Sequence, residues 1–318
     1  VEFGMREIGG YIELDNYSLP MLHEDGIKLN SGRNALCYIL KSKRIKEILM
    51  PEFMCDSCNA ILERLKVRVR YYSVDTSFKP MDIERTADEY LYVINYYGQL
   101  SNDFLLSLGE HIIVDNSQAY FQNPVDGVDT IYTCRKFFGV PDGAILYTDK
   151  ILDEDLQMDE SYERMHFLLG RYEKTASEFY QEYVRNNELF VNEEMKIMSK
   201  LTYNLLRGIH YESVKAIRTE NFTYLHERLK DRNMLSLNIV EGAFMYPLYI
   251  RNGYEIRKKL QEKKIYVPLL WPNVIEQCSK DDIAYDMANN IVPLPVDQRY
   301  SIDEMKYIYD ILRSIMVE

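Results

Sequence analysis

The sequence predicts an α/β fold: one large domain with a mostly parallel sheet, followed by a smaller α+β domain. Three observations lead to this fold class. Short apolar runs alternate with helix-like runs in the first half, long charged segments with helical spacing follow residue 155, and strand-like runs return near the C-terminus. Short runs that are apolar throughout indicate strands buried on both faces, as in parallel sheets. The 318 residues suffice for both domains.

The first half supplies the predicted sheet. Two helices are expected there, in "LCYILKSKR" (36–44) and "DSCNAILERL" (56–65). The expected strands are rich in β-branched and aromatic residues. They lie in "IKEILMPEF" (45–53), "VRVRYYSV" (67–74), "YLYVINYYG" (90–98), "HIIVDNSQ" (111–118), "DTIYTC" (129–134) and "AILYTD" (144–149).

The second half is predicted to be helical first and mixed afterwards. Long helices are expected in 177–209 and 211–231, where apolar residues recur at helical spacing among charges. The tail then reads as strands in "FMYPLYI" (244–250), "IYVPLL" (265–270) and "IVPLPV" (291–296), with helices in 253–264 and 301–315. We place the large domain at 1–205 and the small domain at 206–318, and leave open whether the N-terminal segment joins the small domain.

Composition and charge exclude several classes of protein. The formal net charge is -12, and no long Lys/Arg run is present, which disfavours binding to nucleic acid or to an anionic membrane. No stretch approaches 18 uninterrupted apolar residues. The N-terminus lacks the layout of a secretion signal, and five cysteines suggest free thiols, so we expect a cytoplasmic protein.

The cysteine pair Cys55-Asp-Ser-Cys58 allows three interpretations. A CxxC pair can be a redox motif or half of a zinc site, but zinc needs two further ligands at similar spacing, and the five histidines form no pair. The simplest interpretation is two small buried thiols at a helix start. No metal site is predicted.

Two segments of the first half could bind an anion and a cationic group at the end of the sheet, where parallel strands place ligands. In "LNSGRNAL" (29–36), Ser31, Gly32 and Arg33 begin a helix whose free amides and dipole attract an anion; the alternative is an ordinary cap formed by Ser31. In "IIVDNSQA", Asp115 ends an apolar strand and is either a helix cap or a partner for a cation, and Gln118 lies one turn on.

A third segment, "TCRKFFGVPDGAIL" (133–146), contains a lysine among turn-forming and aromatic residues. Thr133 precedes Lys136 by three residues, so one hydroxyl and one amine could serve a phosphate and a carbonyl. The alternative is a salt-bridged lysine in a tight loop. In a fourth segment, "INYYGQLSND" (94–103), Tyr96, Tyr97 and Gln99 either face a ligand or cover the sheet edge.

The order of these segments resembles that of pyridoxal-phosphate (PLP) enzymes of the aspartate-aminotransferase fold, fold type I, and most closely the DegT/DnrJ/EryC1/StrS aminotransferases. "MPEFMCDSCNAI" is similar to that family's P-x-x-T-x-x-x-x-x-N-A-I, "NYYGQLSND" to its H-x-Y-G-Q-x-x-D, and "VDNSQAY" to its D-x-A-Q/H-A. "RKFFGVPDGAILYTD" is similar to its K-x-x-x-x-x-[DE]-G-[GA], and the last 60 residues or so resemble its C-terminal strands and L-P ending. The resemblance runs from about residue 28 to the end, and implies a three-layer αβα large domain.

The resemblance implies a role for each candidate residue. Lys136 would form the Schiff base with PLP and move the proton between cofactor and substrate carbons, in a pocket dried by its phenylalanines. Asp115 would hold the pyridine nitrogen protonated, and Gln118 would bind the ring hydroxyl. The residues implied to bind the cofactor are Ser31, Gly32, Arg33, Cys55, Asp115, Gln118, Thr133 and Lys136.

The chain departs from the family pattern at three of these positions. Cys55 stands where the family has an aromatic residue stacked on the ring, and Arg33 replaces a threonine of the phosphate loop. The family's serine five residues before the lysine is absent, and Thr133 is its substitute here.

The resemblance implies a PLP-dependent aminotransferase that moves an amino group from glutamate to a nucleotide-linked keto-sugar. One alternative is a PLP-dependent sugar dehydratase, which carries histidine in place of the lysine. The other is a non-catalytic protein of the same fold, a sensor or partner-binding module.

A homodimer with a shared site is also expected, because fold type I sites usually lie at a dimer interface. The stretch 155–235 carries more apolar residues than one face needs, Phe167, Leu168, Tyr172, Phe179, Tyr183, Phe190, Tyr203 and Leu205. Arg185, Asn186 and Asn187 are the polar side chains expected to reach the partner's site; the alternative is that the apolar residues only cover the sheet.

Overall fold

The computed structural model of the protein describes residues 8–317, and a seven-stranded sheet lies at its centre. The strand order is β1-β7-β6-β5-β4-β2-β3. These strands are β1 (Ile27–Leu29), β2 (Glu47–Pro51), β3 (Arg68–Tyr72), β4 (Tyr90–Ile94), β5 (Ile112–Asp115), β6 (Asp129–Thr133) and β7 (Ala144–Tyr147). Strands β3, β2, β4, β5 and β6 are parallel, whereas β7 is antiparallel to both of its neighbours. The predicted mostly parallel sheet is confirmed.

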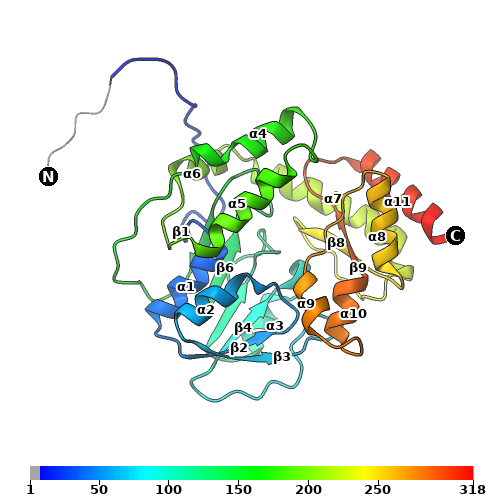
Figure 1. The fold of residues 1–318 in the computed structure, drawn as a ribbon, viewed down its shortest axis with the longest axis horizontal. Coiled ribbons are helices and arrows are strands. Elements are labelled where there is room, and N and C mark those ends of the chain that lie inside the picture. The colour runs from blue at the N-terminus through cyan, green and yellow to red at the C-terminus, as the bar shows by residue number, and fades with distance from the viewer. Residues whose placement is uncertain (1–7, 318) are drawn as a thin grey trace.

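Helices pack around this sheet and beside it (Figure 1). The helices of the first half are α1 (Gly32–Ser42), α2 (Asn59–Arg64) and α3 (Asn102–Ser107). They are followed by α4 (His166–Glu173), α5 (Tyr180–Asn192), α6 (Lys200–Leu206) and α7 (Tyr211–Leu229). The last four are α8 (Gly253–Glu262), α9 (Pro272–Gln277), α10 (Ile283–Asn290) and α11 (Ile302–Val317).

The central strands are buried along almost their whole length, which explains their continuous apolar sequence. Four of the five residues of β2 and β4 are buried, and so are the first three of β5 and β7. A strand covered on both faces gains from apolar residues at every position, not only at alternate ones. The exception is β3 at the sheet edge, where only Tyr72 is buried.

A second, two-stranded sheet lies at the C-terminal side of the molecule. Strands β8 (Met245–Tyr249) and β9 (Ile291–Pro295) pair antiparallel, with α7, α8 and α11 grouped around them in Figure 1. This unit has its own apolar core, which includes Phe222, Leu248 and Leu294. The boundary at residue 206 remains a prediction. In chain order, helix α7 lies between the strands of the large sheet and those of the small one.

Two sequence predictions about the second half are wrong. The run "IYVPLL" (265–270) is irregular, although Ile265 and Val267 are buried. Its Pro268 lacks the backbone N–H that a ladder requires. The run 177–209 is also not one helix, because residues 193–199 separate α5 from α6.

Residues 15–19 lie against α6, whereas Tyr11 and Ile12 before them are 97% and 90% exposed. The backbone N–H of Tyr17 donates to the Asn204 side chain at 2.9 Å, and the N–H of Leu19 donates to the Arg207 carbonyl at 3.0 Å. None of the helices in the described residues is both long and apolar enough to cross a membrane.

Candidate functional site

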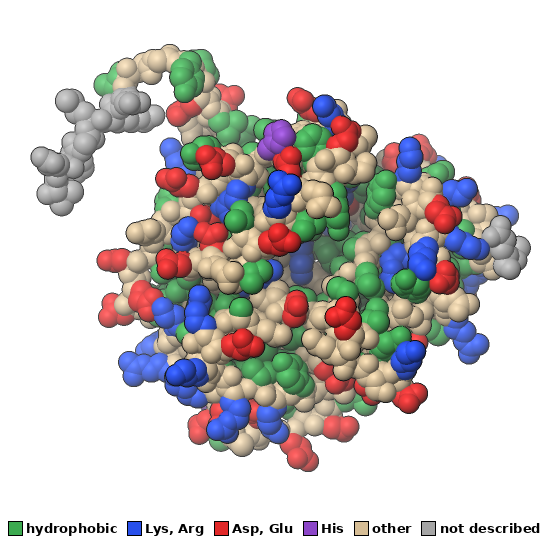
Figure 2. Space-filling view, viewed as in Figure 1, with side chains coloured by type: hydrophobic (Ala, Val, Ile, Leu, Met, Phe, Trp, Pro, Cys, Tyr) green, Lys and Arg blue, Asp and Glu red, His purple; other side chains and the backbone are tan. Residues whose placement is uncertain are grey.

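The candidate residues meet where β5 and β6 end, opposite the start of α1. Asp115 is the last residue of β5 and Thr133 the last of β6, and these two strands are parallel neighbours. Lys136 follows Thr133 in the loop that leads to β7. Figure 2 shows a hollow near the middle of this face of the molecule, with a Lys or Arg side chain visible inside it. The strand ends therefore place the candidate groups where an α/β sheet binds its ligands.

Lys136 lies between the two strand ends. Its Nζ donates a hydrogen bond to Ser117 Oγ at 2.8 Å and lies 5.7 Å from the centre of the Phe244 ring. The side chain is exposed in the single chain, so the expected dry surroundings are wrong. Phe137 and Phe138 point into the core instead, where they are 3% and 5% exposed. An exposed amine can be reached by a ligand.

Both carboxylate oxygens of Asp115 have partners. The Tyr92 hydroxyl donates to Oδ2 at 2.7 Å, and the backbone N–H of Ser117 donates to Oδ1 at 2.7 Å. Burial first, and then the nearby Asp115 charge, raise the pKa of the Tyr92 hydroxyl well above its usual value, which keeps it a donor. The carboxylate is thereby fixed in direction at the strand end.

The start of α1 forms a close-packed cradle with the end of β6. Gly32 is the first residue of the helix, and a Cβ placed on it would lie 2.6 Å from Thr133 Cγ2, so only glycine fits. The Ser31 hydroxyl accepts from the Asn34 N–H at 3.2 Å, which confirms its role as the helix cap. The free amides of the first turn remain available for an anion at this point.

Two arginines extend from this cradle to α5 of the same chain. Arg33 Nη1 donates to the Asn187 carbonyl at 3.4 Å, and Arg135 Nη2 donates to the Asn187 side-chain oxygen. The Arg135 guanidinium lies 4.7 Å from the centre of the Phe190 ring, and burial lowers its pKa to about 10. Two arginine side chains therefore run from the start of α1 and from the lysine loop to Asn187 on α5.

The remaining two predicted residues are Gln118 and Cys55. Gln118 is buried, and its Oε1 accepts the N–H of Tyr97 at 3.0 Å. Cys55 Sγ lies 3.0 Å from Ser57 Oγ, and Cys58 is near enough to Asp115 for that charge to act on its thiol. The segment that contains Cys55 and Cys58 therefore lies near the end of β5, whereas the Gln118 oxygen is bonded to the Tyr97 backbone.

The structure favours the simplest interpretation of the cysteine pair. Burial raises the pKa of the Cys58 thiol to about 12, which makes it a poor nucleophile at neutral pH. All five cysteines are free, and the described residues contain no group of side chains suited to hold a metal ion.

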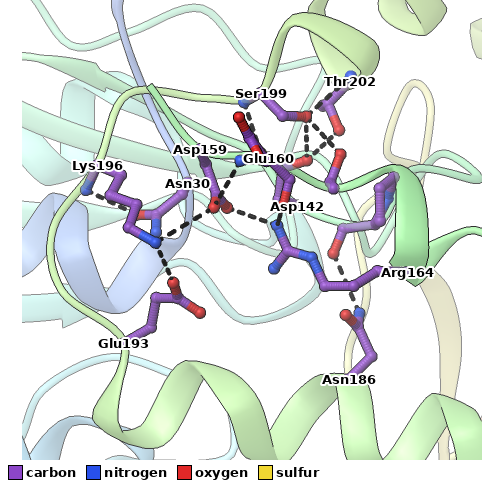
Figure 3. Close-up of polar contacts among 12 residues, drawn as sticks. Asn30, Asp142, Asp159, Glu160, Arg164, Asn186, Glu193, Lys196, Ser199 and Thr202 are labelled. Carbon is purple, nitrogen blue, oxygen red and sulfur yellow. Dashed lines mark hydrogen bonds and ion pairs between the residues drawn. The ribbon is translucent and has the colours of Figure 1, made fainter. Parts of the chain in front are cut away.

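The turn that follows Lys136 is anchored by a buried aspartate (Figure 3). Asp142 is fully buried and accepts from the Ser199 N–H at 2.8 Å, from Ser199 Oγ at 2.7 Å and from Thr202 Oγ1. The next residue, Gly143, has φ +114, and its N–H donates to the Asn30 carbonyl at 2.8 Å. The lysine loop is therefore tied to α6 and to the residue just before the α1 cap.

Two of the three polar residues expected to reach a partner's site are hydrogen-bonded within their own chain. Asn186 is 3% exposed and donates to the Pro141 carbonyl at 3.1 Å, so within this chain its side chain is turned inward. Asn187 bonds Arg33 and Arg135 of its own chain. Only Arg185 is exposed among the three.

The sequence did not single out two residues that touch the candidate groups, Ser117 and Tyr92. Ser117 occupies the alanine position of the D-x-A-Q/H-A pattern, and this departure could have drawn attention to it. Tyr92 lies on a different strand from Asp115, and no local pattern marks it. Tyr96 is buried and donates to the Phe53 carbonyl at 2.5 Å, so it packs at the edge of the sheet.

The chain resembles known proteins in its fold and not in its overall sequence. Neither the protein-family models nor the curated proteins contain a match to the chain. Solved structures do match. The sugar aminotransferase CalS13 from Micromonospora echinospora has a TM-score of 0.60 at 13% identity, over 91% of this chain and 86% of that chain.

Two further solved structures resemble the chain to the same degree. A DegT DnrJ EryC1 StrS aminotransferase from Brucella abortus gives a TM-score of 0.61 at 14% identity, over 91% of this chain and 85% of that chain. Spr1654 from Streptococcus pneumoniae, in its PLP form, gives 0.62 at 13% identity, over 94% of this chain and 92% of that chain. The chain thus has the α/β fold of PLP-dependent aminotransferases. The motifs predicted this fold, and the matched structures include a DegT DnrJ EryC1 StrS aminotransferase.

Proposed function

We propose that the protein is a PLP-dependent aminotransferase in which Lys136 carries the cofactor. The observation that supports this most directly is the meeting of an exposed lysine amine, a fixed carboxylate and a glycine-lined helix start at the ends of two adjacent strands. These three groups match the three parts of PLP: its aldehyde, its pyridine nitrogen and its phosphate.

The residues present fit the cofactor on the evidence of the chain's own geometry. The absence of a side chain on Gly32 lets Thr133 at the end of β6 pack against the first turn of α1, and the helix dipole there favours the charge of a phosphate. A carboxylate at the strand end suits a protonated ring nitrogen. The bound cofactor supplies an electron sink that eases breakage of bonds at the substrate carbon.

The chain's own groups would then act as follows. Lys136 would hold the cofactor through its Nζ and would carry the proton that moves during transfer. Asp115 would stabilise a positive charge on the ring nitrogen. Gly32, Arg33 and Thr133 would hold the phosphate together with the Ser31 turn. We assign Gln118 to the ring hydroxyl and Cys55 to the ring face.

We further propose glutamate as amino donor, a nucleotide-linked keto-sugar as acceptor, a homodimeric assembly and a cytoplasmic location. The sugar acceptor is supported by the neighbour CalS13, whose description names a sugar aminotransferase. Lysine at position 136 argues against the sugar dehydratase, which has histidine there. The remaining alternative is a protein that binds PLP without catalysis.

The donor half-reaction tests the aminotransferase. The PLP-loaded protein is mixed with glutamate, and the cofactor's absorbance and the release of 2-oxoglutarate are followed together. We expect conversion to the amine form with one 2-oxoacid released per site. If PLP binds but neither glutamate nor any other common amino acid converts it, the non-catalytic alternative replaces the enzyme.

A further inference from the structure

A buried arginine from the C-terminal half reaches the loop of Lys136 without pairing with any carboxylate among the described residues. Arg218 lies in the middle of α7 and is 1% exposed. Its Nη2 donates to the carbonyl of Phe137, the residue directly after Lys136, at 3.1 Å. Burial lowers the pKa of this guanidinium to about 10, and the charge of Asp297, which makes no ion pair with it, opposes the shift. A charge held in this way is costly unless its hydrogen bonds are well made.

Arg218 also binds a second segment near the lysine. Its Nη1 donates to the carbonyls of Ala243 at 2.9 Å and Phe244 at 3.4 Å. Phe244 is the residue whose ring lies 5.7 Å from Lys136 Nζ. One side chain thus binds the backbone of two residues that lie next to Lys136, Phe137 and Phe244.

Gln298 binds both Arg218 and the carbonyl that Arg218 contacts. Arg218 Nε donates to Gln298 Oε1 at 2.7 Å, and Gln298 Nε2 donates to the same Phe137 carbonyl at 2.8 Å. The Arg218 guanidinium also stacks 4.6 Å from the centre of the Phe137 ring. Four of the five N–H groups of Arg218 are bonded within the chain and the side chain is 1% exposed, so Arg218 is held by the protein rather than presented to a substrate.

We propose that Arg218 and Gln298 are positioning residues that hold the Lys136 loop at the distance and angle needed for attachment to PLP. The proposal rests on the proposed function, since it assumes that Lys136 is the attachment residue. The C-terminal half would then act on the site indirectly: Arg218 on α7 and Gln298 in the loop after β9 bind the carbonyl of Phe137, the residue that follows Lys136. Loss of these hydrogen bonds should slow the capture of PLP, by which we mean attachment of its aldehyde to Lys136. It should weaken the binding of the rest of the cofactor much less.

The test separates capture from binding. Pyridoxamine phosphate lacks the aldehyde, so its affinity reports on the phosphate cradle and Asp115 alone. The rate at which PLP becomes reducible onto Lys136 by borohydride reports on the lysine. These two quantities are measured for the wild type and for Arg218→Met, Arg218→Lys and Gln298→Ala. The matched control is Arg228→Met, an exposed arginine on the same helix that stacks on Tyr224.

We expect Arg218→Met and Gln298→Ala to slow capture by on the order of 10- to 100-fold, because small misplacements of a reacting group have effects of this size. Pyridoxamine phosphate affinity should stay within about threefold of wild type, and Arg218→Lys should recover part of the rate. Gln298 is only half-buried, so its variant should fold even if Arg218→Met does not.

Two results would overturn the proposal. Equal capture rates in wild type and Gln298→Ala, or losses of capture and affinity that run in parallel in every variant, would mean that these residues serve only the fold. If wild-type protein captures PLP at a lysine other than Lys136, the proposed function fails first and the positioning role with it.

Discussion

At the scale of single residues, the site is defined by groups whose directions are set by neighbours. Asp115 is held on both oxygens, by Tyr92 and by the Ser117 amide. Ser117 also accepts from Lys136 through its hydroxyl, so one residue touches both candidate catalytic groups. Such double contacts reduce the reorganisation that a bound cofactor would require.

Asp115→Asn should keep cofactor binding and lose most of the donor half-reaction. The amide has the same shape and can still accept the Ser117 N–H, but it carries no charge to stabilise a protonated ring. We expect the rate of conversion with glutamate to fall by on the order of 100-fold or more. Stopped-flow absorbance measures it, with the exposed Asp103→Asn as control. A rate near wild type in the site variant would remove Asp115 from the mechanism.

The sequence predicts some residue contacts and not others for a physical reason. Lys136, Asp115 and Gly32 each stand in a local pattern, a turn, a strand end or a helix start, which sequence can display. The contacts of Tyr92 and Arg218 join segments 23 and 81 residues apart and depend on how the sheets pack. No local pattern records such a contact.

At the scale of elements, the loop between β6 and β7 is as well fixed as the strands it joins. Asp142 binds two residues near the start of α6, and Gly143 binds Asn30. The segment 265–270, by contrast, was predicted to be a strand and is irregular. Its alternating burial satisfies the strand pattern, but Pro268 lacks the backbone donor that a ladder needs. Alternating burial alone therefore does not make a strand.

Asp142→Ala should destabilise the protein by on the order of 3 kcal/mol, because three donors lose their charged acceptor in a buried place. Thr202→Val removes only one of these bonds and should cost about 1 kcal/mol. Chemical denaturation of the two variants, with exposed Asp153→Ala as control, measures the difference. If Asp142→Ala is no less stable than the control, the network does not anchor the loop.

At the scale of the whole molecule, apolar side chains on α4 and α5 remain exposed in the single chain. Tyr172 is 91% exposed, Leu169 and Tyr180 are each 57% exposed, and Leu189 is 52% exposed. Phe167 and Phe190 from the same stretch are buried, so part of it does cover the chain's own core. The exposed part supports the proposed two-fold interface.

We predict a homodimer that the double variant Tyr172→Asp/Tyr180→Asp converts toward monomer, since two buried charges would oppose association. Light scattering after size exclusion measures the mass, and Tyr307→Asp, which changes an exposed tyrosine on α11, serves as control. A wild-type monomer with full PLP occupancy would contradict the assembly. A dimer in which Arg185→Ala leaves PLP affinity unchanged would remove the last of the three residues expected to be shared.

The central claim is that Lys136 binds PLP covalently, and one measurement tests it most directly. Purified protein is supplied with PLP, reduced with borohydride and digested, and the modified peptide is identified by mass spectrometry. The account predicts a phosphopyridoxyl group on Lys136, lost in Lys136→Ala and retained in the exposed-surface control Lys150→Ala. A group on another lysine in the wild type, or none after PLP is supplied, would contradict the claim.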